Sequence, residues 1–391
     1  MTKLLVLGAS EFQIPLLKQA RKMGINTCVL DYNENAPGIK YADEYRQCSL
    51  KDIPTAVKIA YEYKPNGVTA GMVDVAVCTC ARICKELGLP GLSVAVAERS
   101  TDKFKMIEAF KANNVPHPQY IYFSKNTFSK EKINLKYPLI VKPIDMAGSR
   151  GIELVNSEDE LATAVNKSIM ASDKGEIIIE EYMVGPEVSV ELFVEGYKPY
   201  VLQITDKLTS GAPHFMEIGH SQPSSLSNQI KDSIARVACS AVEALGLNNC
   251  VAHAEIIITE EGPKMVEIGA RMGGDGIQQQ LIELSTGINL QEIVIKLAMG
   301  EQVSCPHSTI KQASAIRFIP SREGTVVDVE APEILDKCIK MVNLLCNPGE
   351  RVSNAKDNSG RLGYVIAQAD SASEAIMACE DTIKKVKIVL E

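Results

Sequence analysis

The sequence predicts a folded protein of mixed α/β and α+β class, built from two to three domains. Its 391 residues exceed the size at which a single hydrophobic core usually stops growing. The first hundred residues alternate strand and helix patterns, which is typical of a parallel sheet. The middle of the chain is instead rich in strand patterns that favour antiparallel pairing, and a last block again mixes strands and helices.

The composition is that of an ordinary globular protein, with 46% hydrophobic and 23% charged residues. The formal net charge is -8 and the lysines do not cluster, which argues against nucleic acid as a partner. No apolar run approaches the ~20 residues needed to cross a membrane. Residues 1–8 read as a strand and a turn, without the pattern of an export signal. We therefore expect a cytoplasmic protein that binds neither nucleic acid nor membrane.

The 11 cysteines are scattered through apolar segments, where cysteine acts as a small hydrophobic residue in a reducing compartment. Cys78, Cys80 and Cys84 are close in sequence and could hold a metal. They lack a second cluster of ligands, which favours core packing over a metal site.

Residues 1–98 are expected to form an N-terminal βαβ domain that opens with a strand at Lys3–Leu7. The turn after this strand lacks the second and third glycines of a dinucleotide-binding fingerprint, so NAD is weakly supported. The following helix N-terminus could still hold the anionic end of a substrate. Asp31, at the end of the second strand, could accept ribose hydroxyls or simply cap a turn.

Residues 99–300 are expected to form a second domain, with a small α+β lobe at about 119–184. In this lobe a strand ends at Lys142 and leads into a flexible, glycine-containing loop over Ile144–Gly151. The polar, proline-bearing stretch Lys207–Ser227 is expected to be a long loop that closes over a substrate.

Two glutamates, Glu255 and Glu267, lie in apolar strand patterns on either side of the turn Glu260–Pro263. This turn predicts a hairpin, which would place both carboxylates side by side. Such carboxylates repel each other unless a cation lies between them, and oxygen ligands of this kind suit Mg²⁺. The alternative is a pair of solvated glutamates, which their apolar surroundings disfavour.

Further charged residues are ambiguous when taken one at a time. Arg271 opens a glycine-rich loop and could clamp a phosphoryl group or a carboxylate, or could be a surface arginine. Lys142, at its strand end, could reach phosphate oxygens together with the amides of the loop that follows. The segment Glu180–Met183 could read an adenine edge, and Glu187 just beyond it could accept ribose hydroxyls.

The order of these segments resembles that of the ATP-grasp superfamily over essentially the whole chain. The resemblance rests on Lys103 in Asp102–Met106, Lys142 in Tyr137–Pro143, the glycine loop, Glu180, Glu187, Glu255 and the run Glu267–Arg271. Within the superfamily, His253–Glu255, Glu267–Gly274 and the tail Arg361–Ile366 look most like the carboxylate-amine ligase or L-amino-acid ligase branch. Residues 301–391 are similar to the C-terminal domain of that branch.

The resemblance implies ATP and Mg²⁺ as cofactors, with Mn²⁺ as a further possibility. Catalytic roles would fall to Lys142 and Arg271, and the metal would be held by Glu255 and Glu267. Nucleotide contacts are implied for Lys103, Lys142, Gly148, Ser149, Gly151, Glu180, Glu181, Tyr182, Met183 and Glu187. On the expected loop, His214, Glu217 and His220 are candidates for binding the amine or its carboxylate, with the alternative that at least two of them are ordinary loop residues; Gly273 and Gly274 are further candidates for substrate contact. Gly269 stands where many relatives carry asparagine, which leaves open whether one or two metal ions bind.

The implied reaction is the activation of a small carboxylate by ATP to an acylphosphate, which an amine then captures to form an amide, possibly in a dipeptide. Its partners would be small-molecule carboxylates and amines, and a homodimer is the expected assembly. Three alternatives remain: a purine-pathway ligase of the phosphoribosylglycinamide synthetase type, a small-molecule kinase, and a nucleotide-binding subunit without turnover.

Overall fold

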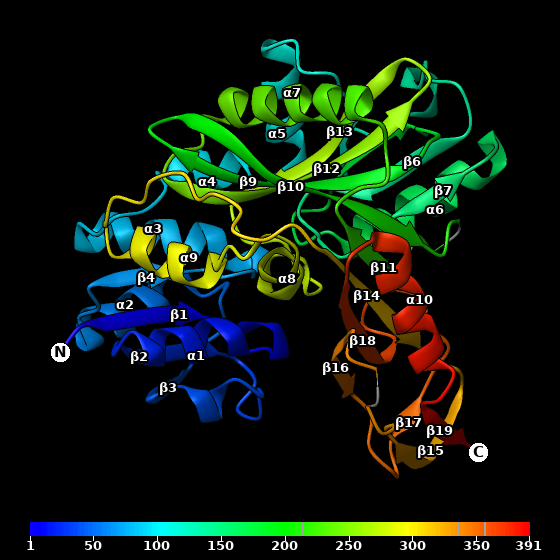
Figure 1. Ribbon diagram of the computed structural model, residues 1–391. Coiled ribbons are helices and arrows are strands. Elements are labelled where there is room, and N and C mark those ends of the chain that lie inside the picture. Colours follow the sequence, from blue (N-terminus) through cyan, green and yellow to red (C-terminus); the bar gives the residue numbers. More distant parts are fainter. Residues whose placement is uncertain (213, 335, 356) are drawn as a thin grey trace.

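The computed structural model describes residues 1–391 except 213, 335 and 356, and it shows three regions (Figure 1). The N-terminal region holds a parallel sheet with strand order β3-β2-β1-β4, as the opening βαβ pattern predicts. Strands β1 and β2 are buried almost throughout, because helices cover the faces of a parallel sheet. The elements are β1 (Lys3–Leu7), α1 (Ile14–Lys22), β2 (Asn26–Asp31), β3 (Glu44–Gln47), α2 (Ile53–Tyr63), β4 (Gly67–Thr69), α3 (Val77–Leu87) and α4 (Val94–Arg99).

The end of β2 decides between the two interpretations of Asp31. Its Oδ2 accepts a hydrogen bond from the amide of Ala9 at 2.8 Å, and its Oδ1 accepts one from the amide of Asn33 at 2.9 Å. Asp31 therefore ties together the turns that follow β1 and β2. Cys80 and Cys84 pack in or against the apolar core of the same region, as the core-packing interpretation predicts.

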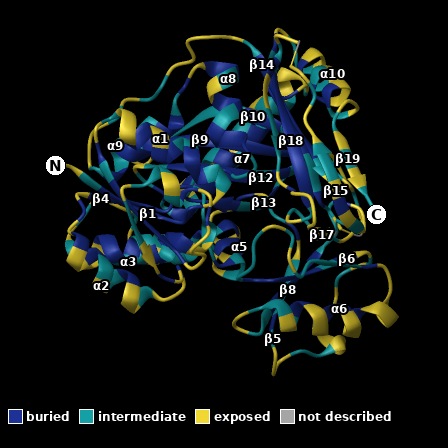
Figure 2. Cartoon of the chain, turned by 90° about the horizontal axis from the view of Figure 1, so that it is seen from below, coloured by how far each residue is buried: buried dark blue, intermediate teal, exposed yellow. Residues whose placement is uncertain are grey.

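The small lobe is an antiparallel sheet with strand order β5-β8-β6-β7, covered by α6. Figure 2 shows the outer face of α6 exposed and its inner face against the sheet. Buried leucine, isoleucine and valine side chains form a core between helix and sheet. The elements, with the helix α5 that precedes them, are α5 (Lys103–Ala112), β5 (Tyr120–Ser124), β6 (Leu139–Pro143), β7 (Glu153–Val155), α6 (Glu158–Ala171) and β8 (Glu176–Glu181).

The largest sheet has eight strands in the order β13-β12-β9-β10-β11-β14-β18-β16. Its first five strands come from the middle of the chain, and α7 packs on them over an apolar core (Figure 1). The elements of this part are β9 (Glu187–Glu195), β10 (Lys198–Thr209), β11 (Glu217–Gln222), α7 (Asn228–Leu245), β12 (Cys250–Thr259), β13 (Gly262–Gly269), a π-helical turn (Ile277–Leu281), α8 (Ile282–Thr286) and α9 (Leu290–Ala298).

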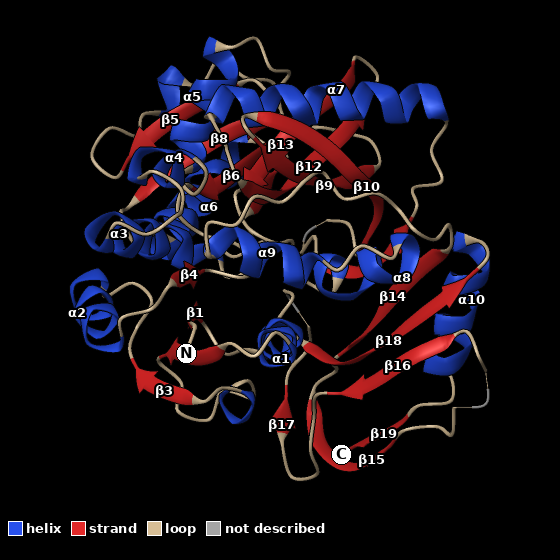
Figure 3. Ribbon diagram, turned by 60° about the vertical axis from the view of Figure 1, so that its left-hand side comes forward, coloured by secondary structure: helices blue, strands red, loops and turns tan. Residues whose placement is uncertain are grey.

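The C-terminal part extends the same eight-stranded sheet. Strand β14 pairs with β11, and β18 and β16 follow it at the edge of the sheet, while α10 covers β14 and β18 (Figure 3). A small sheet, β17-β15-β19, lies beside them. The elements are β14 (Ala313–Pro320), β15 (Gly324–Glu330), β16 (Ile339–Leu344), β17 (Arg351–Val352), β18 (Arg361–Ala369), α10 (Ala372–Ile383) and β19 (Lys387–Leu390).

The prediction of a long loop over Lys207–Ser227 is wrong. The stretch begins in the last residues of β10 and continues through β11, and the two strands pair from Asp206↔Ser221 to Thr209↔Glu217. The polar residues of this hairpin are buried between the sheet and its neighbours, so their polarity does not mark solvent exposure: His220 and Gln222 are each 0% exposed. Only short connections separate the strands and the following helix.

Candidate active site

A cleft lies between the small lobe and the face of the large sheet, with ≈ 970 Å³ of empty space that is partly open to solvent. Strands from both sheets contribute to its walls. Of the sequence-predicted residues, the cleft brings together Lys103, Lys142, Gly148, Ser149, Glu180, Glu181, Tyr182, Met183, Glu187, Glu217, Glu255 and Glu267. Side chains distant in sequence thus converge as the motif order predicts.

Glu255 and Glu267 are direct partners across the β12–β13 hairpin, which confirms the predicted side-by-side placement. Partners in an antiparallel pair project from the same face of a sheet. A lysine faces each carboxylate: Lys207 Nζ lies 3.1 Å from Oε2 of Glu255, and Lys103 Nζ lies 2.9 Å from Oε2 of Glu267. Both carboxylates line the cleft and offer the oxygen ligands that Mg²⁺ prefers.

Lys103 owes its position to the start of α5. Asp102 caps this helix, because its side chain accepts hydrogen bonds from the amides of Phe104 and Lys105, each at 3.1 Å. Lys103 then points to the cleft, where its Nζ also donates to the carbonyl of Met146 at 2.7 Å. Burial would lower the pKa of Lys103, but the carboxylate of Glu267 outweighs it and raises the pKa above the usual value.

Lys142 and Glu180 form a buried ion pair on adjacent strands of the small lobe, with Nζ 2.7 Å from Oε2. In the β6–β8 register Glu180 pairs with Ile140, so Lys142 is its diagonal neighbour on the same face. The pair stands at the wall of the cleft. A lysine held there is placed to meet an anionic ligand, and its partner is placed to accept hydrogen bonds from that ligand.

The glycine loop after Lys142 has the backbone of an anion-binding loop. Gly148, Ser149 and Gly151 have φ of +67°, +60° and +74°. Turns that include left-handed residues can present successive backbone amides to an anion such as a phosphate group. Gly148 and Ser149 line the cleft, whereas Gly151 packs against Pro143 and Ala171.

Lys207 is a central residue of the cleft that the sequence did not single out. Its Nζ lies 2.7 Å from Glu187, 3.1 Å from Glu217 and 3.1 Å from Glu255, and its side chain is 3% exposed. Burial alone would lower its pKa, yet the three carboxylates outweigh burial and hold the pKa well above the ordinary value. The residue was missed because β10 was expected to end before it.

A second polar group adjoins Glu217 at the end of the cleft. Arg361, from β18, lies 2.9 Å from Oδ1 of Asp275, and His220 Nε2 lies 3.1 Å from Oε2 of Glu217. Burial and the neighbouring Glu217 raise the pKa of Asp275. Burial would also raise the pKa of Glu217, but Lys207 and His220 outweigh it and hold this pKa well below the usual range. Asp275 was not predicted, and the tail containing Arg361 was noted only as part of a resemblance.

His253 is buried behind the cleft, between two carboxylates. Its Nδ1 lies 3.0 Å from Oε2 of Glu191, and its Nε2 lies 3.4 Å from Oε1 of Glu255. Burial would lower the pKa of His253, but Glu191 and Glu255 outweigh it and raise the pKa to about 10. The imidazolium therefore holds Glu255 from the side opposite to Lys207.

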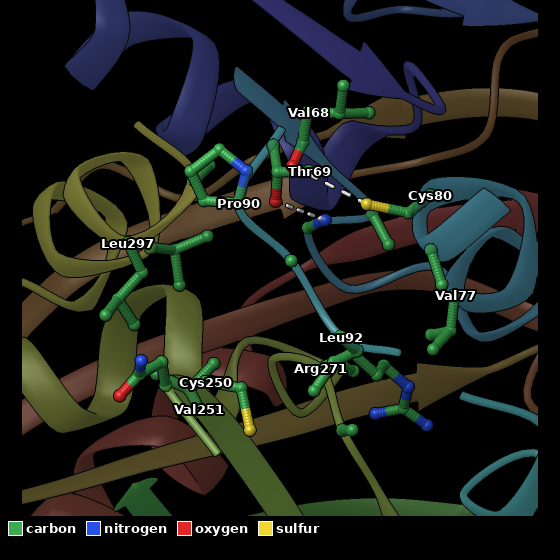
Figure 4. Close-up of a pocket in the computed structure, with 18 residues that line it drawn as sticks. Val68, Thr69, Val77, Cys80, Pro90, Leu92, Cys250, Val251, Arg271 and Leu297 are labelled. Atoms are coloured by element: carbon green, nitrogen blue, oxygen red, sulfur yellow. Dashed lines mark hydrogen bonds between the residues drawn. The ribbon is translucent and has the colours of Figure 1, made fainter. Parts of the chain in front are cut away.

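Besides Gly151, five sequence-predicted residues do not line this cleft in the described part of the chain. The guanidinium of Arg271 binds Asp74 of the N-terminal region, with Nε 3.0 Å from Oδ1. Arg271 also borders a second pocket between β4, α3 and β12 (Figure 4). The other four are His214, which is exposed, His220, which contacts Glu217, and Gly273 and Gly274; Gly273 leaves no room for a side chain beside His253.

The comparisons with known proteins agree with this fold and cleft. Residues 135–279 match the ATP-grasp domain family, so this part of the chain is an ATP-grasp domain. Residues 317–391 match the L-amino acid ligase C-terminal domain 2. The β12–β13 hairpin and the Lys142 loop both lie inside the first match.

Relatives of known structure share the whole fold. An L-amino acid ligase from Bacillus licheniformis superposes with a TM-score of 0.86 at 23% identity, covering 100% of this chain and 99% of the other. A phosphoribosylglycinamide synthetase from Anaerococcus prevotii gives 0.82 at 23% identity, covering 100% of both chains. These likenesses concern the fold alone.

A curated relative is the alanine–anticapsin ligase of Bacillus subtilis (strain 168), 26% identical over 284 residues. The alignment covers 66% of this chain and 59% of the ligase, so the chain accounts for well under two thirds of that relative's length. Within the described residues, no helix is long and apolar enough to span a bilayer.

Proposed function

We propose that this protein is an ATP- and divalent-metal-dependent carboxylate-amine ligase that forms an amide bond, as in a dipeptide, through an acylphosphate. The observation that carries the proposal is the Glu255–Glu267 pair, which faces Lys103, Lys142 and Lys207 across one cleft. Carboxylates that bind a metal and lysines that bind phosphates are the parts that phosphoryl transfer requires. The C-terminal match and the alanine–anticapsin ligase relative support the amide-forming outcome.

The chain's own residues define the roles we propose. Glu255 and Glu267 would hold the metal, which would supply positive charge to offset that of the transferred phosphoryl group. Lys103, Lys142 and the amides of the glycine loop hold the phosphates. The hinge Glu180–Met183 holds adenine, and Glu187 accepts the ribose hydroxyls. Positioning and charge neutralisation account for catalysis, because the reaction needs no covalent enzyme nucleophile.

Arg271 takes a different place from the one implied by resemblance alone. Its ion pair with Asp74 keeps the guanidinium beside Glu267, at the junction with the N-terminal region. We propose that it acts on the phosphoryl group from this side, with Asp74 fixing its orientation. Gly273 and Gly274 would then shape the adjoining part of the substrate site.

The acceptor end of the cleft supports an amine substrate over a phosphorylated one. Glu217 and Asp275 place two carboxylates there, near His220. Carboxylates attract an ammonium group and repel a phosphate ester. Lys207, His220 and Arg361 offset part of this negative charge. The preference for amino acid-like substrates over the phosphoribosyl substrates of the purine-pathway alternative therefore also rests on the C-terminal match.

Other features of the protein remain proposals as well. Oxygen ligands accept Mn²⁺ in place of Mg²⁺. All 11 cysteines are free thiols, which supports a reducing compartment such as the cytoplasm. A homodimer is proposed on the prevalence of two-fold assemblies, and light scattering would measure it.

The reaction is tested by ADP release against a panel of amino acids, single and in pairs, with mass spectrometry of the products. A ligase releases ADP only when carboxylate and amine are both present and yields a product lighter than their sum by one water. A kinase releases ADP with one substrate and yields a phosphorylated product. ADP release without any dipeptide or amide product contradicts the proposal.

The metal assignment is tested by Glu267→Gln. The change removes one anionic oxygen ligand, so we expect turnover to fall by roughly 10²-fold or more, about 3 kcal/mol of transition-state stabilisation, while the protein stays folded. Steady-state ADP release against Mg²⁺ concentration measures the effect. Glu261→Gln is the matched control, because Glu261 lies at the exposed turn of the same hairpin. Normal turnover in Glu267→Gln contradicts the assignment.

A further inference from the structure

Lys207 stands where three parts of the proposed reaction meet. Its ammonium contacts Glu187, Glu217 and Glu255, which come from β9, β11 and β12. In the proposed function these carboxylates serve ribose, substrate and metal respectively. One buried cation therefore touches a group from each of the three ligand sites.

The charge at this point is unbalanced. A single ammonium faces three carboxylates within 3.1 Å; His220 and Asp275 adjoin Glu217, His253 contacts Glu255, and Asp275 is in turn paired with Arg361. Carboxylates this close repel one another strongly in a buried setting unless cations separate them. Lys207 therefore determines how closely Glu187, Glu217 and Glu255 converge.

The placement of Lys207 is fixed by the sheet. Strand β10 pairs with β9 on one side and with β11 on the other, so its residues lie between those that carry Glu187 and Glu217. Its side chain is 3% exposed, so its ammonium contacts the carboxylates in place of solvent. The three carboxylates fix the position of the lysine ammonium, and the ammonium in turn fixes the positions of the carboxylates.

We propose that Lys207 is a positioning residue of the ligation site: its ammonium is the internal counter-ion that keeps Glu187, Glu217 and Glu255 convergent and sets how strongly this group attracts a divalent cation. The inference rests on the proposed function for the identity of the three ligand sites. The physical basis of the inference is that the positive charge of Lys207 competes with the charge of a metal ion bound at Glu255. Removing the lysine should make the carboxylates bind a metal more tightly and metal-free nucleotide more weakly.

The test compares wild type with Lys207→Met, which keeps the length of the side chain without its charge. Mn²⁺ is titrated into the full chain without nucleotide and followed by electron paramagnetic resonance; ATP is titrated separately in EDTA by calorimetry. We expect Mn²⁺ affinity to rise roughly tenfold and metal-free ATP affinity to fall roughly tenfold, as one charge at this separation can produce. Lys387→Met is the control, because Lys387 faces Asp328 and Glu330 far from the cleft.

Two further variants separate positioning from a merely structural role. Lys207→Met combined with Glu217→Gln removes one charge of each sign, so its Mn²⁺ affinity should return to within about threefold of wild type. If Lys207→Met alone does not fold, this double variant and Lys207→Arg carry the test. Lys207→Arg keeps the charge but not its compact shape, so Mn²⁺ affinity should stay near wild type while kcat falls more than the KM for ATP changes.

The outcomes are decisive in both directions. Unchanged Mn²⁺ affinity in Lys207→Met, or the same gain in Lys387→Met, overturns the inference. A gain in Mn²⁺ affinity that the double variant reverses supports it. These titrations need no amino acid, so a protein that shows the metal effect but ligates nothing would refute the proposed function and leave the role of Lys207 standing.

Discussion

His253 shows how one buried side chain supports the candidate metal site. Its imidazolium contacts Glu191, which is 0% exposed, and Glu255, which faces the cleft. Glu191 also accepts hydrogen bonds from Ser189 and Gln278. A carboxylate buried in this way requires a cationic partner. His253 thus stabilises the fold and orients a metal-binding carboxylate at the same time.

The pH dependence of stability tests this pair. The pKa of about 10 in the folded chain exceeds the imidazole value of ~6.5 in an unfolded chain. The stabilisation is therefore fully present below pH ~6.5 and is lost as the pH rises through about 10. We expect His253→Gln to lower the free energy of unfolding by about 3–5 kcal/mol at pH 6, and by much less at pH 10.

Urea unfolding in EDTA at pH 6, 8 and 10 measures the difference between wild type and His253→Gln. EDTA removes metals that would otherwise compete for Glu255. The exposed His307 provides the control, since His307→Gln should leave the unfolding curves unchanged. A difference between wild type and His253→Gln that is independent of pH contradicts the pairing.

Individual site residues could be predicted from the sequence where the residues next to them in the chain form a recognisable pattern. Glu255 and Glu267 stand out as charges in apolar strands on either side of a turn, and Lys142 stands before a glycine loop. Lys207 carried no such signal, because its significance comes from three carboxylates on other strands. Asp275 sits in a glycine-rich loop and meets its partner Arg361 only through the fold.

The connection between the small-lobe sheet and the eight-stranded sheet contains a position where no side chain fits. Gly185 joins β8 to β9, with φ of +154°, and a Cβ there would lie 2.0 Å from the carbonyl oxygen of Ile258. That distance is far below any contact a real side chain makes, and the obstacle is backbone rather than a flexible side chain. Gly185 therefore allows the small lobe to lie against the end of β12.

Replacement of this glycine gives a prediction for the hinge. We expect Gly185→Ala to lower the free energy of unfolding by roughly 2–4 kcal/mol and to weaken nucleotide binding, because the hinge must move to relieve the overlap. Thermal unfolding and ATP titration measure the two effects. Gly196→Ala is the matched control: Gly196 has φ of +55° but open space around it, so only about 1–2 kcal/mol of backbone strain is expected. Equal effects in both variants contradict the steric argument.

The elements also show where pattern reasoning succeeds and fails. The opening βαβ unit and the β12–β13 hairpin follow from local periodicity and turn chemistry, which the sequence displays. The β10–β11 hairpin was mistaken for a loop, because its polar residues are buried by partners that the sequence does not reveal. Buried polar strands at a site break the usual link between polarity and exposure.

In the whole molecule, one sheet passes from the ATP-grasp part into the C-terminal part. Strands β11 and β14 pair with Gly219 opposite Arg317, so residues from both sides of the expected boundary at 300/301 share hydrogen bonds. The domain limits 1–98, 99–300 and 301–391 remain a proposal. The shared sheet brings Arg361, on β18, to the acceptor end of the cleft.

Arg361 provides a prediction at this scale. Arg361→Met removes the cation that opposes the effect of burial and Glu217 in raising the pKa of Asp275, so Asp275 takes up a proton more readily and attracts an ammonium group less. We expect the KM for the amine substrate to rise roughly tenfold while ATP affinity stays within about twofold. Steady-state kinetics with each substrate varied, together with ATP titration, separates the two. Arg351→Met is the control, because Arg351 is exposed on β17. Loss of ATP affinity instead of amine affinity would place Arg361 elsewhere in the mechanism.

The hydrogen-bonded seam between β11 and β14 also limits how this protein can be re-engineered. A C-terminal segment taken from another ATP-grasp protein would have to present a strand in the same register opposite Gly219, whose missing side chain leaves the space that Arg317 occupies in this chain. Chimaeras joined within the connection after α9 should therefore fold only when donor and recipient strands match residue for residue. The strands that join the C-terminal part to the sheet also bring Arg361 to the cleft, so a change in one affects the other.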